Sequence, residues 1–248
     1  HGLAAVVEPM DGPVAAEALL RESLANYRET LGEDHPETAT VLMDLADTLR
    51  QQERYAEARD LIAEARRVFA TAYGDAPHPR MGHVLTAEAL IHRAQREYEA
   101  AERASRASLA LRRRLFPGPH RETVSSLNNL GSLLMDMRRY EESVGLLLEA
   151  LDMTDALGPN VDPNIGTIWN NLGRAYFLAG RFREAEEALR EALRQDEQYH
   201  PPYSDPVIED LKGLSFALDA QGDLTGAIKI WREMIARRMR APHPSGDK

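Results

Sequence analysis

The sequence contains no cysteine, which excludes disulfides, thiolate metal sites and cysteine nucleophiles. It also has no apolar run near the roughly 20 residues that a membrane-spanning helix needs. The longest such run, Val144–Leu148, is bounded by Glu141, Glu142 and Glu149. No signal peptide is visible, although the chain starts at His1 and not at methionine. Because the lack of cysteine fits a reducing compartment, we expect a cytoplasmic protein without a membrane span.

An excess of basic residues is also missing. The formal net charge is −10 and the sequence pI is about 5.3, whereas a protein that binds duplex nucleic acid needs a basic face to neutralise phosphates. Short basic runs such as Arg112–Arg114 are typical of solvated helix ends. We therefore expect no nucleic-acid partner.

Catalytic motifs are absent as well. The sequence has no H-E-x-x-H, phosphate-binding G-x-x-x-x-G-K-[S/T], G-x-G-x-x-G or G-x-S-x-G string. The acidic pairs Glu141-Glu142 and Glu186-Glu187 fit solvated helix faces better than paired acid–base catalysis. We expect neither an enzyme nor a bound cofactor.

What the sequence does contain is a repeat. An aromatic residue or leucine, followed by a short stretch that leads to alanine or serine, recurs at steps of 43, 42, 42 and 42 residues, at Tyr55, Tyr98, Tyr140, Phe182 and Leu224. A second marker keeps this register to within one residue. A proline opens four of the five units, at Pro36, Pro79, Pro163 and Pro206, and Arg121 stands at the corresponding position of the remaining unit. Two markers in one register indicate a repeat architecture.

Each unit predicts two amphipathic helices joined by a short turn. Apolar residues follow three- and four-residue spacing, as in Thr123–Met137. Histidine or aspartate precedes the proline and is suited to capping the first helix. We predict a partial repeat over residues 1–34 and five repeats over 35–77, 78–119, 120–161, 162–204 and 205–240. A tail over 241–248 follows, and the whole chain has eleven main helices and no strand.

Small residues recur where the two helices of a unit must approach closely. They occupy one position of each first helix (Ala46, Ala89, Gly131, Gly173, Ser215) and one of each second helix (Ala58, Ala101, Ser143, Ala185, Ala227). A single helix pair cannot bury its apolar face, so neighbouring repeats must stack to form a continuous core.

One unit makes the resemblance specific. The segment Trp169-Asn-Asn-Leu172-Gly173-Arg-Ala-Tyr176 resembles the tetratricopeptide pattern W-x-x-L-G-x-x-Y. The 42-residue period and the His-Pro starts resemble the repeats of kinesin light chains and their bacterial relatives. The resemblance covers about residues 14–240. It implies an all-α, right-handed superhelical solenoid of antiparallel helix pairs that holds another protein or peptide.

The resemblance also implies that the first helices line a concave groove. Asparagines sit there at identical positions of two neighbouring repeats, and an asparagine amide can both donate to and accept from a peptide backbone. The predicted peptide-binding residues are Asn128, Asn129, Ser132, Asn170, Asn171, Arg174 and Phe177. The alternative is that the asparagines bond within their own repeat. The first two repeats carry Met43-Asp44 and Thr86-Ala87 instead.

The ends of the array pose a separate question. Residues 15–32 match a second helix without its first, because Pro9, Gly12 and Pro13 break the preceding segment. The last helix, about 223–240, has no following repeat to cover it. We expect apolar surface at both ends, covered by another copy of the chain, by terminal segments or by residues of a longer protein. The residues predicted for end-to-end self-association are Leu20, Tyr27, Trp231 and Ile235.

Two polar features need an interpretation. His35, His78 and His120 lie one repeat apart, too far from one another to share a zinc ion, so we interpret them as turn residues and expect no metal site. Glu88 stands where the other repeats have leucine, and a buried carboxylate needs a partner. We expect Arg93, Arg96 or His92 to supply it, unless the helix is locally shifted.

The leading function is a peptide- or protein-binding scaffold that uses the concave groove of the array. The main alternative is a ligand- or peptide-sensing domain that regulates an attached kinase or transcription regulator. A self-assembling scaffold joined through its uncapped ends is a further alternative. Repeats of this class occur in proteins of very different function, so the fold by itself does not decide among these.

Overall fold

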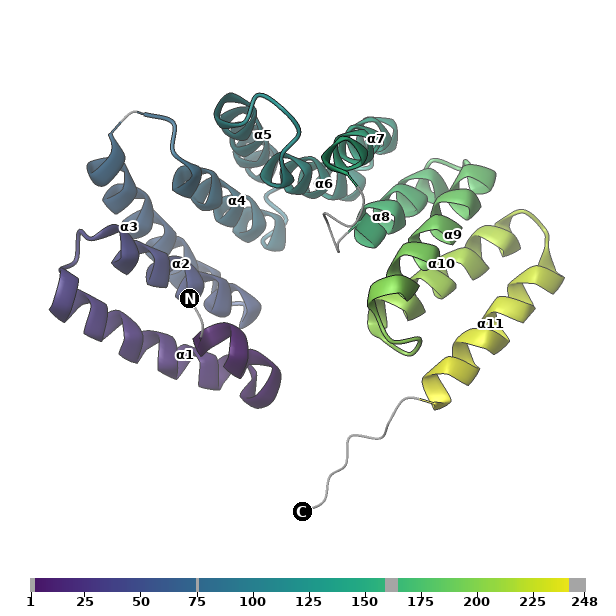
Figure 1. Ribbon diagram of the computed structural model, residues 1–248, viewed down its shortest axis with the longest axis horizontal. Helices are drawn as coiled ribbons and strands as arrows, with labels where there is room; N and C mark the ends of the chain where they lie inside the picture. The colour runs from purple at the N-terminus through teal and green to yellow at the C-terminus, as the bar shows by residue number, and fades with distance from the viewer. Residues whose placement is uncertain (1–2, 75, 159–164, 241–248) are drawn as a thin grey trace, which may run out of the picture. The chain divides into compact units, whose positions relative to one another are not determined.

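The computed structural model describes residues 3–74, 76–158 and 165–240, with side chains from residue 14 onward. The described residues form eleven α-helices and no strand. In chain order (Figure 1) the helices are α1 (Leu3–Leu31), α2 (Pro36–Gln51), α3 (Tyr55–Tyr73), α4 (Pro79–Ala94), α5 (Tyr98–Leu115), α6 (Arg121–Asp136), α7 (Tyr140–Leu157), α8 (Ile165–Leu178), α9 (Phe182–Tyr199), α10 (Asp205–Ala220) and α11 (Leu224–Met239). This is the predicted arrangement of one single helix followed by five pairs. Within these ranges no helix combines the length and apolar character needed to cross a bilayer.

The helices pack in two layers within each of two compact units, residues 1–117 and 118–248. In the first unit α2 pairs with α3 and α4 with α5, while α1 and α3 each pack on the first helix that follows them. In the second unit the pairs are α6–α7, α8–α9 and α10–α11, with α7 packed on α8 and α9 on α10. The first helices also contact one another, α2 with α4, and α6 and α10 with α8. This stacking of pairs is the all-α solenoid that the sequence predicts.

Histidines start three of the first helices. The Nδ1 atoms of His35, His78 and His120 each accept a hydrogen bond of 3.2 Å from the backbone N–H two residues later. Each histidine has extended backbone angles and caps a helix whose first amides have no intrahelical acceptor. The interpretation of these residues as turn residues is therefore correct, and their role is capping.

Two expectations about helix starts are wrong. Helix α1 begins at Leu3 and continues through Pro9 and Pro13, because an internal proline removes one hydrogen bond and bends a helix but does not always end it. Figure 1 shows the darkest purple part of α1 turned away from the axis of the rest. Asp205 lies in the first turn of α10, so the cap position belongs to Ser204, whose side chain makes no cap hydrogen bond. The pair Asp162-Pro163 and the tail 241–248 lie outside the described residues.

Glycine allows the two helices of a pair to approach closely in the second unit. A Cβ atom added to Gly173 would lie 2.5 Å from Cγ of Leu189 and 3.3 Å from the carbonyl oxygen of Ala185. Gly131 meets Leu147 in the same way at 2.9 Å. All ten small residues of the repeat are buried, which is the packing that their spacing predicts.

Candidate peptide-binding site

The predicted asparagines lie on α6 and α8, which are in direct contact. The side-chain amide Nδ2 of Asn171 donates a hydrogen bond of 2.9 Å to Oδ1 of Asn128. Asn171 is only 8% exposed, whereas Asn128 is half-buried. A buried amide needs such a partner, so this bond fixes the register of α8 against α6.

The neighbouring asparagine of α8 turns to the opposite side. Nδ2 of Asn170 donates a hydrogen bond of 2.6 Å to Oδ1 of Asp210 in α10. Asn170 and Asn171 therefore connect α8 to both flanking first helices. The bonds run between repeats, which differs from the alternative of bonding within one repeat.

The remaining predicted residues differ in how accessible they are. Asn129 is half-buried, and its side chain makes no hydrogen bond with any residue that the structure describes; Arg174 is exposed on α8. Ser132 is half-buried on α6. Phe177 packs on Phe182 with ring centroids 5.5 Å apart and rests against the core around Leu189. Asn129 and Arg174 are therefore the two predicted residues best placed to meet a ligand.

Sequence reasoning missed a pair of carboxyl groups behind this surface. Asp210 is 1% exposed and Asp196 of α9 is 4% exposed, and the two carboxyl groups lie within hydrogen-bonding reach of each other. Burial raises the pKa of Asp210 to about 8. The hydrogen bond from Asn170 opposes this rise, and the Asp196 and Glu197 carboxylates add to it. Burial also raises the pKa of Asp196. The sequence does distinguish these two residues, because the other repeats carry no aspartate or glutamate at either position.

In the first unit Glu88 has a partner that the sequence did not suggest. Its Oε2 atom accepts from Nη2 of Arg66 in α3 at 2.7 Å. Of the expected partners, His92 pairs with Glu97 at 2.5 Å instead. Burial raises the pKa of the Glu88 carboxyl, while the charges of Arg66 and His92 oppose the rise. The correct partner comes from the preceding helix, 22 residues earlier in the chain.

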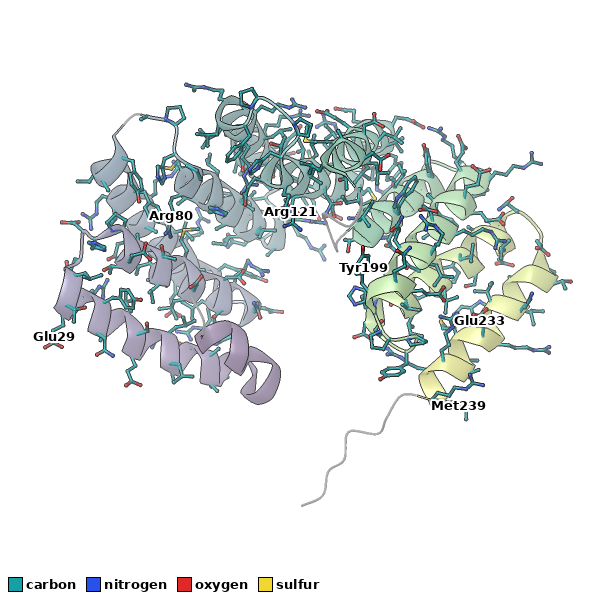
Figure 2. The ribbon with its side chains drawn as sticks, viewed as in Figure 1. Glu29, Arg80, Arg121, Tyr199, Glu233 and Met239 are labelled. Carbon is teal, nitrogen blue, oxygen red and sulfur yellow. The ribbon has the colours of Figure 1, made fainter. Side chains whose placement is uncertain are left out.

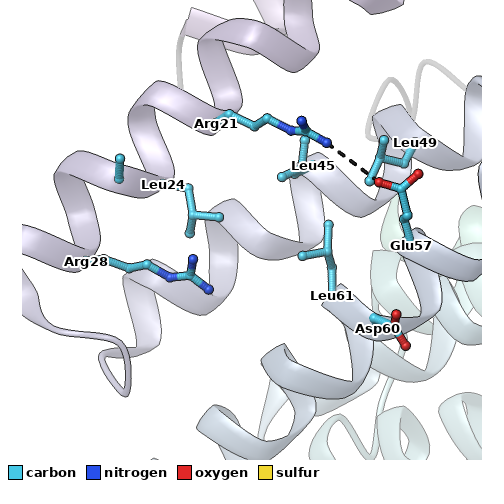
Figure 3. A pocket seen from close by; sticks show the side chains of 9 residues that line it. Arg21, Leu24, Arg28, Leu45, Leu49, Glu57, Asp60 and Leu61 are labelled. Carbon is cyan, nitrogen blue, oxygen red and sulfur yellow. Dashed lines mark ion pairs between the residues drawn. The ribbon is translucent and has the colours of Figure 1, made fainter.

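The first unit also contains a pocket of about 410 Å³ between α1, α2 and α3 (Figure 3). Leu24, Leu45, Leu49 and Leu61 supply its apolar lining. Charged groups stand at its edge, including an ion pair of 3.7 Å between Nη2 of Arg21 and Oε2 of Glu57 (Figure 3). No motif in the sequence indicated this pocket. Across the described ranges, no group of three or more histidine or acidic side chains is arranged to hold a metal ion.

The two ends of the chain differ. Leu20 is 6% exposed and belongs to the core of the first unit, and Tyr27 packs against that core. The expectation of open surface at Leu20 is therefore wrong, because α1 turns this face toward α2. On α11, by contrast, an apolar row is exposed, namely Leu224, Ile228, Trp231, Ile235 and Met239. Figure 2 shows Met239 at the end of this helix.

The repeats of this chain match a known family and several known proteins. A family model described as tetratricopeptide repeat matches residues 1–71, 43–114, 80–156, 122–198 and 164–240. Kinesin light chain-related protein 3 of Arabidopsis thaliana is 25% identical over 218 residues, which cover 88% of this chain and 33% of that protein. Kinesin light chain-related protein 1 of the same plant is 24% identical, over 79% of this chain and 31% of that protein. The chain thus spans about a third of the length of these relatives.

Solved structures with similar folds share less sequence. BtubC (BKLC) from P. vanneervenii has a TM-score of 0.78 at 18% identity, with 95% of this chain and 94% of that chain covered. A signal transduction ATPase with a tetratricopeptide repeat sensor, from Pyrococcus horikoshii, has a TM-score of 0.76 at 17% identity. The match covers 98% of this chain and 35% of that chain. At this level of identity the likeness concerns the fold alone.

Proposed function

The chain belongs to the tetratricopeptide repeat family, and from that premise we propose that it is a protein-interaction module in the cytoplasm. The α6–α8–α10 face, defined by Asn128, Asn129, Asn170, Asn171 and Arg174, holds an extended segment of a partner protein or peptide. A carboxamide can grip a peptide backbone whatever the side chains of the peptide. Arg174 adds a charge-assisted hydrogen bond to a carboxylate on the bound segment.

The observation that carries the proposal is the pair of hydrogen bonds that run from Asn171 to Asn128 and from Asn170 to Asp210. They hold three neighbouring helices in one register, so Asn129 and Arg174 stand on a pre-organised surface. Such a surface loses little side-chain freedom when a ligand binds, which favours affinity.

Peptides selected from a random library against the purified chain test this function. The affinity of a selected peptide is then measured by titration calorimetry for the wild type and for Asn129→Ala combined with Arg174→Ala. We expect the double variant to bind about tenfold more weakly or worse, because it loses about 1 kcal/mol or more per hydrogen bond. Arg183→Ala, an exposed change on α9, is the matched control. Equal affinity of the double variant and the wild type would show that peptides bind elsewhere.

A sensing role is the second candidate. The Pyrococcus horikoshii ATPase, which has a similar fold, is described as carrying its tetratricopeptide repeats as a sensor. In this version the same face binds a ligand or peptide and regulates an attached kinase or transcription regulator. The sequence of the complete gene distinguishes the two, since a sensor requires an effector domain in the same chain or in an associated one.

We further propose that two copies of the chain associate head to tail, with α11 of one copy against α1 of the other. Ile228, Trp231 and Ile235 are 52%, 36% and 53% exposed, whereas the equivalent residues of α7, which are Val144, Leu147 and Leu151, are at most 5% exposed. The α7 residues lie on the helix that packs on α8.

The charges beside the exposed apolar residues favour α1 of a second copy as the partner of α11. The exposed Lys229 and Arg232 flank the row on α11, and the exposed Glu22 lies within one turn of the exposed Leu19 on α1. A contact between two copies of α11 would instead bring basic residues together, which is unfavourable. Opposite charges therefore favour the pairing of unlike ends.

A further inference from the structure

Two aspartates occupy positions that are not acidic elsewhere in the array. Asp196 of α9 stands where Phe69, Arg112 and Thr154 stand in the other second helices. Asp210 of α10 stands where the other first helices carry a residue without charge, namely Val41, Val84, Ser126 and Ile168. In the first unit the equivalents of the two aspartates, Phe69 and Val84, belong to one apolar core cluster. An apolar contact between repeats is thus replaced here by two carboxyl groups.

The surrounding backbone makes room for this replacement. A Cβ atom added to Gly166 of α8 would lie 1.8 Å from Oδ1 of Asp196, so this carboxyl group fills the space that a side chain would take. Oδ1 of Asp210 accepts from Asn170 at 2.6 Å. Oδ2 of Asp210 is buried and has no hydrogen-bond partner among the described residues. An unpartnered buried oxygen beside a second carboxylate is unfavourable, and a proton on it removes the penalty.

The charged groups around the pair do not neutralise Asp210. On α9, Asp196 and Glu197 face it, and on α8 the neighbouring group is the neutral Asn170. On α11, Arg237 pairs with Glu197 at 2.6 Å, and Arg238 pairs with Asp205 at 2.8 Å. The charge of His200, just after α9, lowers the pKa of Asp196 and so opposes the effect of burial.

We propose that Asp196 and Asp210 share one proton, and that this proton keeps α9 and α10 in contact, so that Asp210 stays where it accepts from Asn170 on the α6–α8–α10 face. The proton sits on Oδ2 of Asp210 and is donated to the Asp196 carboxylate. Oδ1 of Asp210 then accepts from Asn170, and the buried Oδ2 atom gains the partner that it otherwise lacks. Asp210 is a positioning residue in this arrangement, since it acts on a ligand only through Asn170.

The shared proton makes the binding face sensitive to pH. When the proton leaves, two carboxylates repel each other at the α9–α10 contact, and this repulsion displaces Asp210. Asn170 moves with Asp210, because the hydrogen bond from Asn170 favours the ionised carboxylate and is kept. The expected change in peptide affinity rests on the proposed function, whereas the sharing of a proton by the two aspartates does not depend on it. We expect a bound peptide to be released progressively as the pH rises through about 8, the pKa of Asp210.

Carbon-13 NMR of the aspartate carboxyl groups in the complete chain tests the proposal without any ligand. We expect one carboxyl transition centred between about pH 7 and 9 that disappears in Asp210→Asn. The side-chain amide signals of Asn170 should move with the same midpoint, which a merely structural role of Asp210 would not produce. Two carboxyl groups that both titrate below about pH 5, or an Asn170 signal that ignores the transition, would overturn the proposal.

Two further variants keep the test decisive if Asp210→Asn fails to fold. Asp210→Ser copies the residue at the equivalent Ser126, and Asp196→Thr copies Thr154. Asp210→Ser should abolish the transition near pH 8, because the carboxyl group that holds the proton is gone. Asp196→Thr leaves Asp210 buried and should lower the midpoint of the transition, because the repulsion from the second carboxylate is removed. A transition that survives in Asp210→Ser, or one that Asp196→Thr does not move, contradicts the proposal. Peptide binding plays no part in these measurements, so their failure is distinct from failure of the proposed function.

Discussion

The side-chain amide of Asn171 in α8 donates a hydrogen bond of 2.9 Å to Oδ1 of Asn128 in α6, a residue 43 positions earlier in the chain. The bond joins corresponding layers of two neighbouring repeats. Because Asn171 is buried, water cannot readily replace Asn128 as the acceptor for its side-chain amide. Removal of either asparagine therefore leaves the other without this hydrogen bond.

This relationship predicts strong coupling between the two asparagines. Asn171→Ala and Asn128→Ala should each lower the free energy of unfolding by about 1 kcal/mol. The double variant should lose less than the sum of the two, by about 0.5 kcal/mol or more. Urea denaturation of the four proteins measures the cycle. Asn129→Ala, which breaks no bond among the described residues, serves as the control, and strict additivity would show that the bond contributes nothing.

Replacement by alanine should have opposite effects on stability at two glycine positions. Gly173→Ala should destabilise the chain by about 1–3 kcal/mol, because its Cβ would meet Leu189 at 2.5 Å and the backbone of α9 at 3.3 Å. Gly145→Ala in α7 should stabilise it by about 0.5–1 kcal/mol, since no atom lies within 4 Å of the added Cβ. Thermal unfolding of both variants checks the pair. Equal shifts in Tm would mean that α8 and α9 are not in the close contact described.

Replacement of Glu88 should stabilise the first unit in a pH-dependent way. Burial raises the folded-state pKa of this carboxyl, so its contribution to stability is present at low pH and is lost as the pH rises through that pKa. Glu88→Leu, which copies Leu130 and Leu172 at equivalent positions, removes this loss. We expect a gain of about 1 kcal/mol or more at pH 8 and a smaller gain at pH 4, measured by urea denaturation. A gain that is larger at pH 4 would contradict the burial argument.

Head-to-tail association predicts a specific result of mixing. Ile235→Glu disables the α11 end and Leu19→Glu disables the α1 end, because each buries a charge in the apolar contact. Either variant alone should sediment as a monomer, whereas their mixture should form a dimer through the one remaining pair of intact ends. A wild-type chain that stays monomeric at high concentration excludes association, and a Leu19→Glu chain that associates by itself indicates contact between two copies of α11.

Repetition made the helices predictable. Each unit repeats a start signal, a three- and four-residue apolar spacing and a pair of small residues, and these patterns depend only on contacts along or between adjacent helices. The caps at His35 and the close approach at Gly173 follow from such local rules. The start of α1 did not, because proline weakens a helix without deciding whether neighbouring residues continue it. The peptide-binding role of the asparagines stays a prediction.

The sequence by itself determined the helix pairs, their register and the face on which the asparagines lie. Only the tertiary structure decided which side chains meet across that register: Asn171 with Asn128, Arg66 with Glu88, and Asp196 with Asp210. Each pair joins different helices, and the outcome depends on rotamers and on the space left by a residue such as Gly166. A repeat period specifies which positions approach one another. It does not specify the direction of a polar side chain, because burial and available partners set that direction together.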